Sequence, residues 1–300
     1  MHRLPDGRAL ALSEVGPDTG QDVLLCLPGL LETRQTFAPV LQAASAYPHL
    51  RVISVDHCGR GASDPLPGDQ GYTMARYLDD VADLVQRHVL TAGAQRVHVL
   101  GTSMGGILGM YLAANAKCKV RTLILNDVGL SFYWVSIYGL YDGMKKSVGA
   151  LLPEDIAAQL GVTLGAMMAV QSPAHFDLPY RRDWKGMRFA HILEHYSGDV
   201  RLVHGADSGV CLTDQVRELR DQFAFARVLE VPDAKHPAPF TPAVCEFVLA
   251  DLAPASIPEP VPDFVHDSAP APQPSHDGRP ASETQTGVWA WLKRKWAGKS

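Results

Sequence analysis

The sequence lacks most of the features that mark secreted, membrane-spanning or nucleic-acid-binding proteins. Its five cysteines are scattered singly, with no Cys-x-x-Cys pair for zinc binding or dithiol redox chemistry, and this predicts buried, reduced thiols. No apolar run is long enough to span a bilayer, and the N-terminus has no signal-peptide pattern. Lys and Arg total 27 against 32 for Asp and Glu, so the net charge of -5 offers no positive field to nucleic acid. We therefore expect a cytoplasmic protein without a nucleic-acid partner.

The composition that is present indicates a folded domain followed by a different kind of chain. The 300 residues are 46% hydrophobic and 20% charged, which is typical of a globular protein with a sizeable core. Near Ala253 the composition changes, because residues 254–280 contain eight prolines among Ala, Ser, Asp and Gln. Such a segment cannot bury enough apolar surface to fold. We therefore predict a disordered Pro/Ala-rich linker over 254–283 and a separate tail over 284–300.

Short β-branched or Leu-rich runs alternate with helical patterns before the linker. The apolar runs predict buried parallel strands at residues 23–27, 51–55, 97–100, 121–125, 201–203 and 227–231. Residues 73–90 predict an amphipathic crossover helix, with Met74, Tyr77, Val81, Leu84 and His88 opposite Asp79, Asp80, Asp83 and Arg87. Repeated units of this kind predict an α/β protein, with a doubly wound, mostly parallel sheet and functional residues beyond the carboxyl ends of the strands.

The segment 128–199 interrupts this alternation. It separates two predicted strands by far more residues than a crossover needs, and it is rich in aromatic residues. We interpret it as an inserted helical lid, flanked by a core formed from residues 1–127 and 200–253.

A candidate nucleophile follows the strand predicted at 97–100. The sequence Gly101-Thr102-Ser103-Met104-Gly105 matches G-x-S-x-G between a strand and an apolar helical run. In this setting the chain turns sharply, the small residues allow close packing, and the serine hydroxyl is exposed at the start of a helix. Ser103 is therefore the candidate nucleophile.

At this point the chain resembles the α/β-hydrolase family over about residues 8–252. The segment Asp56-His57-Cys58-Gly59-Arg60-Gly61-Ala62-Ser63 is similar to the family's Asp-x-x-Gly-x-Gly-x-Ser turn, to which we assign a structural role. The resemblance implies the α/β-hydrolase fold. The sequence has no phosphate-binding loop, dinucleotide-binding motif or cluster of metal ligands, so we expect catalysis without a cofactor or metal. Relatives that open epoxides or displace halide carry aspartate at the elbow, so Ser103 argues against both activities.

A serine nucleophile needs a base and an orienting acid. His236 follows the last predicted strand, where the family carries its histidine within Gly-His-x-Pro, although Lys235 here replaces that glycine. Two carboxylates qualify as the acid. Asp207 keeps the order Ser, Asp, His, but it lies one residue before the family's Gly-x-x-Asp position, where this chain has Ser208. Asp127 follows the strand after the nucleophile, and a minority of relatives use that position. We favour Asp207 and keep Asp127 as the alternative.

The remaining site residues follow from the same resemblance. The oxyanion should be bound by the backbone N–H groups of Met104 and of Leu30, which aligns with the family's His-Gly-x loop. Phe37, Tyr133 and Trp134 are candidates for an apolar substrate pocket, with ordinary packing as the alternative.

These residues predict a serine hydrolase that cleaves a carboxylic ester of a small to medium apolar molecule through an acyl-enzyme. Four other activities use the same residues: C–C bond, lactone or thioester hydrolysis, and acyl transfer. A ligand-binding protein without turnover is the alternative from another class, and a structural adaptor recruited through the tail is a third.

The tail carries a pattern of its own. Trp289, Leu292 and Trp296 share one helical face, while Lys293, Arg294 and Lys295 add positive charge. This pattern suits peripheral contact with a membrane surface or with a protein groove, and an unstructured solubilising tail is the alternative.

Overall fold

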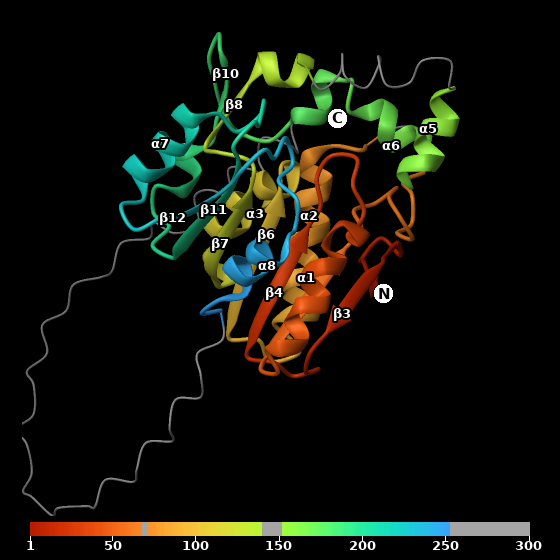
Figure 1. Ribbon diagram of the computed structural model, residues 1–300. Helices are drawn as coiled ribbons and strands as arrows, with labels where there is room; N and C mark the ends of the chain where they lie inside the picture. The colour runs from red at the N-terminus through yellow and green to blue at the C-terminus, as the bar shows by residue number, and fades with distance from the viewer. Residues whose placement is uncertain (68–70, 140–151, 253–300) are drawn as a thin grey trace, which may run out of the picture. The chain divides into compact units, whose positions relative to one another are not determined.

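The computed structural model describes residues 1–67, 71–139 and 152–252 (Figure 1). A seven-stranded sheet has the order β12–β11–β7–β6–β4–β5–β3. Its strands are β3 (Leu12–Val15), β4 (Asp22–Leu27), β5 (Leu50–Val55), β6 (Arg96–Thr102), β7 (Val120–Asn126), β11 (Asp199–Gly205) and β12 (Arg227–Val231). Neighbouring strands are parallel except β3, which pairs antiparallel with β5. The doubly wound, mostly parallel sheet expected from the sequence is confirmed, and all six predicted strands belong to it.

Strand β4 shows why continuous apolar runs form this sheet. All six of its residues are buried. Val23, Leu25 and Leu27 belong to one hydrophobic cluster, whereas Leu24 and Cys26 belong to a second cluster. Successive side chains of a strand point to opposite faces, so a strand covered on both sides needs an apolar residue at every position.

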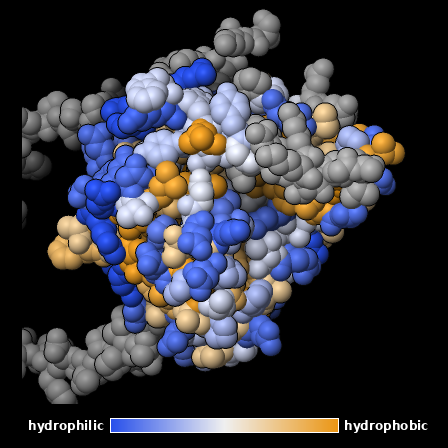
Figure 2. Space-filling view, turned by 45° about the horizontal axis from the view of Figure 1, so that its top comes forward, coloured by the Kyte–Doolittle hydropathy of each residue, from blue (hydrophilic) through white to orange (hydrophobic). Residues whose placement is uncertain are grey.

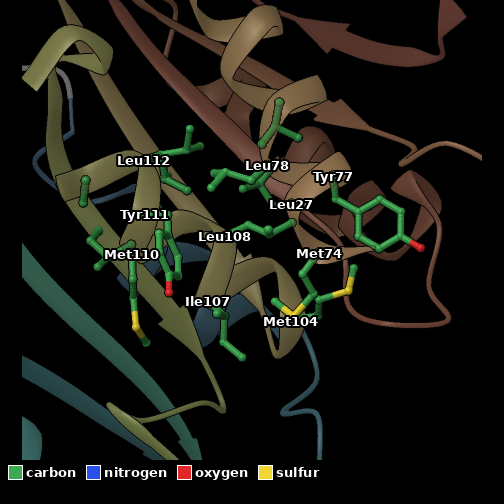
Figure 3. Close-up of a cluster of buried hydrophobic side chains, with 14 of the residues drawn as sticks. Leu27, Met74, Tyr77, Leu78, Met104, Ile107, Leu108, Met110, Tyr111 and Leu112 are labelled. Carbon is green, nitrogen blue, oxygen red and sulfur yellow. The ribbon is translucent and has the colours of Figure 1, made fainter. Parts of the chain in front are cut away.

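Helices cover the two faces. On one face, α2 (Met74–Leu84) packs against α3 (Met104–Ala114), and Figure 3 shows side chains of both helices together with Leu27 of β4. On the other face, α1 (Ala38–Ala43) contacts α8 (Pro242–Leu249). Helix α7 (Thr213–Gln222) connects β11 to β12. Because α3 is buried on nearly all sides, it is apolar all round rather than amphipathic.

The crossover helix predicted at 73–90 forms as α2 followed by a π-helical turn at Val85–Val89. Thr73 caps its start, since the backbone N–H of Arg76 donates to the Thr73 hydroxyl oxygen. The assignment of Asp80 to the solvent-facing side is wrong. Asp80 is 4% exposed, and the Arg8 guanidinium donates to both of its carboxylate oxygens, at 2.9 and 2.8 Å. A partner more than 70 residues away is invisible to helical periodicity.

The segment between β7 and β11 adds elements outside the central sheet. Strands β8 (Ser131–Tyr133), β10 (Gly186–Arg188) and β9 (Arg181–Arg182) form a small antiparallel sheet in that order. The segment also contains helices α5 (Pro153–Leu160) and α6 (Leu164–Ala169) and two 3-10 helices, at Pro173–Phe176 and Ala190–Leu193. In Figure 1, α5, α6 and the small sheet lie above the central sheet. Figure 2 turns this end forward and shows apolar residues in small groups among polar ones. A lid role for 128–199 stays a prediction.

The N-terminal strands β1 (His2–Arg3) and β2 (Ala9–Leu10) form a two-stranded hairpin.

All five cysteines are buried and free. Within residues 1–67, 71–139 and 152–252, no helix combines the length and apolar character needed to cross a bilayer. The predicted linker at 254–283 and the tail at 284–300, with its Trp, Leu, Lys and Arg face, lie outside the described residues.

Candidate active site

Ser103 lies in the sharp turn between β6 and α3. Its backbone has φ 50° and ψ −115°, a left-handed conformation that is costly for a residue with a side chain. The flanking glycines make room for the turn. A Cβ at Gly105 would lie 2.0 Å from the carbonyl oxygen of Leu27, and one at Gly101 would lie 2.3 Å from the backbone of Gly105. The G-x-S-x-G spacing is therefore required by backbone contacts.

His236 lies beside Ser103, in the loop between β12 and α8. Its Nε2 is 3.1 Å from the Ser103 Oγ, and its Nδ1 is 2.9 Å from the Asp127 Oδ2. In the matching tautomer, the serine hydroxyl donates to Nε2 and the Nδ1–H donates to the carboxylate. The imidazole is 11% exposed and the carboxylate is fully buried. This arrangement lets an imidazole take a hydroxyl proton while a carboxylate fixes its orientation.

Lys235 does not disturb the histidine loop. Its side chain is exposed, and its φ is outside the left-handed region, so the glycine that relatives carry here is not required. A glycine is required instead at the end of the neighbouring strand β11, where the backbone packs closely against the histidine loop. A Cβ on Gly205, at the end of β11, would lie 2.7 Å from the carbonyl oxygen of Ala234.

The preference for Asp207 as the acid is corrected by this geometry. Asp207 is exposed, and its backbone N–H donates to the Ala234 carbonyl, 2.9 Å away. The carboxylate beside His236 belongs to Asp127, directly after β7. The Gly205 N–H donates to the Asp127 Oδ1 at 3.0 Å, and the Ser208 hydroxyl donates to the Asp127 Oδ2 at 2.8 Å. Asp127 is thus held by three donors, counting His236.

Sequence reasoning missed two supporting residues. Ser208 stands where relatives carry their acid, and its hydroxyl also accepts from the N–H groups of Val210 and Cys211, both at 3.1 Å. Asn126 joins the elbow to the histidine loop, because its side-chain amide donates to the Thr102 hydroxyl at 3.3 Å and to the Ala238 carbonyl at 3.0 Å. The sequence feature that could have indicated Ser208 is its position, because relatives carry their catalytic aspartate there. No feature of the sequence indicated Asn126.

The role of the Leu30 and Met104 N–H groups in oxyanion binding stays a prediction, but the structure shows the backbone that carries each of them. Met104 is the first residue of α3, so its N–H has no partner within the helix. Leu30 lies in a turn in which the Glu32 N–H donates to the Gly29 carbonyl at 3.3 Å, while the Gly29 N–H donates to the Glu32 carboxylate at 2.7 Å. Burial raises the pKa of Glu32, and the Gly29 N–H and the nearby His236 oppose this shift only in part.

Of the three expected pocket residues, Phe37 is corrected. It has no exposed surface and packs against Phe240, with ring centroids 5.3 Å apart, so it belongs to the core. Tyr133 donates its hydroxyl to Asp214 at 2.7 Å, and this bond, with burial, raises the pKa of Tyr133 to about 12. The Trp134 indole N–H donates to the Asp183 carbonyl at 3.2 Å. A place for Tyr133 and Trp134 in the pocket stays a prediction.

In the described part of the chain, no group of three or more His, Cys, Asp and Glu side chains is arranged to hold a metal ion.

Known proteins resemble this chain in sequence and fold. The family model for the α/β-hydrolase fold matches residues 22–140. A 3-hydroxybutyrate-oligomer hydrolase from Cupriavidus necator is 29% identical over 263 residues, which cover 77% of this chain and 88% of that protein.

Solved structures show the same fold. An α/β hydrolase from Novosphingobium aromaticivorans covers 81% of this chain and 93% of its own, with a TM-score of 0.63 and 20% identity. The enol-lactonase from Burkholderia xenovorans covers 76% and 90%, with a TM-score of 0.56 and 22% identity. The elbow, the sheet order and these likenesses agree: the chain has the α/β-hydrolase fold.

Proposed function

We propose that the protein hydrolyses carboxylic esters through an acyl-enzyme formed on Ser103. The observation that carries the proposal is the hydrogen-bonded chain from the Ser103 hydroxyl through His236 to the buried carboxylate of Asp127, at 3.1 and 2.9 Å. A binding protein without turnover has no need of a strained serine joined to an imidazole and a carboxylate, so this chain favours catalysis over the ligand-binding alternative.

The proposed reaction has two halves. Ser103 attacks the ester carbonyl as His236 takes its proton, and the Leu30 and Met104 N–H groups bind the oxyanion. His236 then protonates the departing alcohol, which leaves an acyl-Ser103. Water, deprotonated by His236, attacks this acyl group and releases the acid, and the proton returns to Ser103. Asp127 keeps the imidazole in the right tautomer throughout.

For the substrate, we propose short esters of hydroxy acids, beginning with linear oligomers of 3-hydroxybutyrate. The named activity of the Cupriavidus necator relative supports this choice, because the likeness extends over most of both chains. A lactone substrate is the second candidate, and it has weaker support, since the enol-lactonase shares the fold at only 22% identity.

The test uses the full chain. Wild type, Ser103→Ala and a control, Ser45→Ala at an exposed serine, are assayed on 3-hydroxybutyrate dimer and trimer, p-nitrophenyl esters of graded acyl length, and a lactone. A fluorophosphonate labels the same samples for mass spectrometry. We expect wild type and Ser45→Ala to cleave esters and gain one phosphonyl group, and Ser103→Ala to do neither. A folded wild type that neither cleaves nor labels would contradict the proposal.

A further inference from the structure

A fully buried arginine lies behind the loop that carries Leu30. Arg60 is 1% exposed, and in the described residues it forms no ion pair with a carboxylate. Its Nε and Nη2 both donate to the Leu30 carbonyl oxygen, at 3.0 and 2.7 Å. Its Nη1 donates to the Cys58 carbonyl at 3.2 Å. A buried guanidinium is costly unless its donors find partners, and here two backbone carbonyls accept from three of its N–H groups.

The two bonds to one carbonyl restrict the turn at Leu30. They fix the peptide plane that follows Leu30. The preceding plane, which contains the Gly29 carbonyl and the Leu30 N–H, is restrained by the Glu32 N–H bond to the Gly29 carbonyl. One peptide earlier, the Gly29 N–H donates to the Glu32 carboxylate. No hydrogen bond in the described residues engages the Leu30 N–H itself. The turn therefore leaves this donor available and sets its direction.

Arg60 is itself held firmly. Its guanidinium carbon lies 4.7 Å from the centroid of the Tyr77 ring, and Figure 3 shows the Tyr77 hydroxyl pointing away from the α2–α3 cluster. Its backbone forms a bridge with Val162, and the neighbouring Gly61 N–H donates to the Gly161 carbonyl at 2.6 Å. The loop that carries Arg60 is thus hydrogen-bonded to the connection between α5 and α6.

We propose that Arg60 is a positioning residue for oxyanion binding: by clamping the Leu30 carbonyl, it aims the Leu30 N–H at the same point as the Met104 N–H. The inference rests on the proposed ester hydrolysis. Loss of one oxyanion donor typically lowers kcat by about 10²–10³-fold. The Arg60→Met variant keeps the Leu30 N–H but no longer fixes its direction. We therefore expect kcat to fall by about 10–100-fold and KM to change less than about threefold. Arg60→Lys keeps the positive charge but not the two-nitrogen geometry of the guanidinium, so its kcat should lie between those of wild type and Arg60→Met.

A second buried arginine provides the matched control. Arg201 is also 1% exposed and donates to three carbonyls, those of Phe247, Val248 and Ala250, at 3.0, 3.2 and 2.7 Å. Unlike Arg60, it also forms an ion pair, because its Nε donates to the Asp199 carboxylate at 3.0 Å. It lies in the middle of β11, about 13 Å along the strand from Gly205 at the carboxyl end. Arg201→Met should lower Tm yet keep kcat, after correction for folded protein.

The experiment measures kcat and KM on the preferred p-nitrophenyl ester, Ki for a matching trifluoromethyl ketone, and amide hydrogen exchange of the peptide that contains Leu30. The ketone forms a tetrahedral oxyanion on Ser103, so in Arg60→Met its Ki should rise by the same factor as kcat/KM falls. Exchange in the peptide that contains Leu30 should also accelerate, because that peptide includes the hydrogen-bonded N–H groups of Gly29 and Glu32. Arg201→Met should change neither the Ki nor this exchange.

The outcomes are distinguishable. An active wild type whose folded Arg60→Met variant keeps its kcat and its Ki would overturn this inference alone. Equal losses of kcat in Arg60→Met and Arg201→Met would also overturn it, because they would show a general effect of stability. A folded wild type without any ester turnover would overturn the proposed hydrolysis, and the inference with it.

Discussion

Asp127, and not Asp207, lies against His236, with its Oδ2 2.9 Å from the His236 Nδ1. Ser103 and His236 each follow a strand that a local sequence pattern predicts. The choice between Asp127 and Asp207 depends on how two loops pack at one sheet edge, and no local pattern contains that information. Asp127 is buried and holds three hydrogen bonds, whereas Asp207 is exposed, so the packing selects Asp127.

The two aspartates offer a paired test of this assignment. Asp127→Asn removes the charge that orients and stabilises the His236 imidazolium, so kcat should fall by about 10⁴-fold, as such substitutions do elsewhere. Asp207→Asn, the control, should keep kcat within about twofold, because surface changes away from a site rarely matter. Steady-state kinetics on one ester decides between them. A large loss in Asp207→Asn with little loss in Asp127→Asn would reverse the assignment.

Among the elements, the buried parallel strands were the most predictable and the edge strand the least. The uninterrupted apolar run at residues 23–27 of β4 is a signal that few other structures produce. Strand β3 has only four residues, none of them fully buried, and it was not predicted. The burial of Asp80 in α2 was missed because its partner, Arg8, lies in a distant hairpin. The small sheet formed by β8, β9 and β10 rests on strands too short to leave a sequence pattern.

The packing of α3 against the sheet requires a residue without a side chain at Gly105. A Cβ at Gly105 would overlap the Leu27 carbonyl oxygen of β4, so Gly105→Ala must push the start of α3 away from the sheet. We expect a loss of about 1–3 kcal/mol in the free energy of unfolding, together with a loss of ester turnover. At Gly209 the same added atom would meet open space, so Gly209→Ala should unfold like wild type. Urea denaturation measures both. Equal midpoints for the two variants would contradict the prediction.

The stability of the whole molecule should depend on pH through histidines that are buried in the neutral form. Burial, with a smaller contribution from the Arg60 charge, lowers the pKa of His57 from 6.5 to about 3. Burial likewise lowers the pKa of His175 to about 4. Below pH 6.5 the unfolded chain takes up protons at both residues and the folded chain does not. Stability is therefore complete above about pH 6.5 and is lost as the pH falls toward 4.

This loss can be measured and assigned. Each histidine contributes a slope of up to about 1.4 kcal/mol per pH unit to the free energy of unfolding. His57→Gln cannot take up the proton, so its stability should fall less steeply than that of wild type between pH 6 and 4.5. Urea denaturation at several pH values gives both slopes. Parallel curves for the two proteins would show that His57 does not contribute.

At Ser103 the requirements of stability and of activity oppose each other, because the left-handed backbone disfavours any side chain, whereas the proposed reaction needs the serine hydroxyl. A glycine at this position would adopt the same dihedral angles without cost, yet it would carry no hydroxyl. Every active copy therefore keeps a conformational penalty that an inert copy avoids. Directed evolution that selects only for thermostability therefore favours inactive variants such as Ser103→Gly. A search for a more stable enzyme must measure both turnover and Tm.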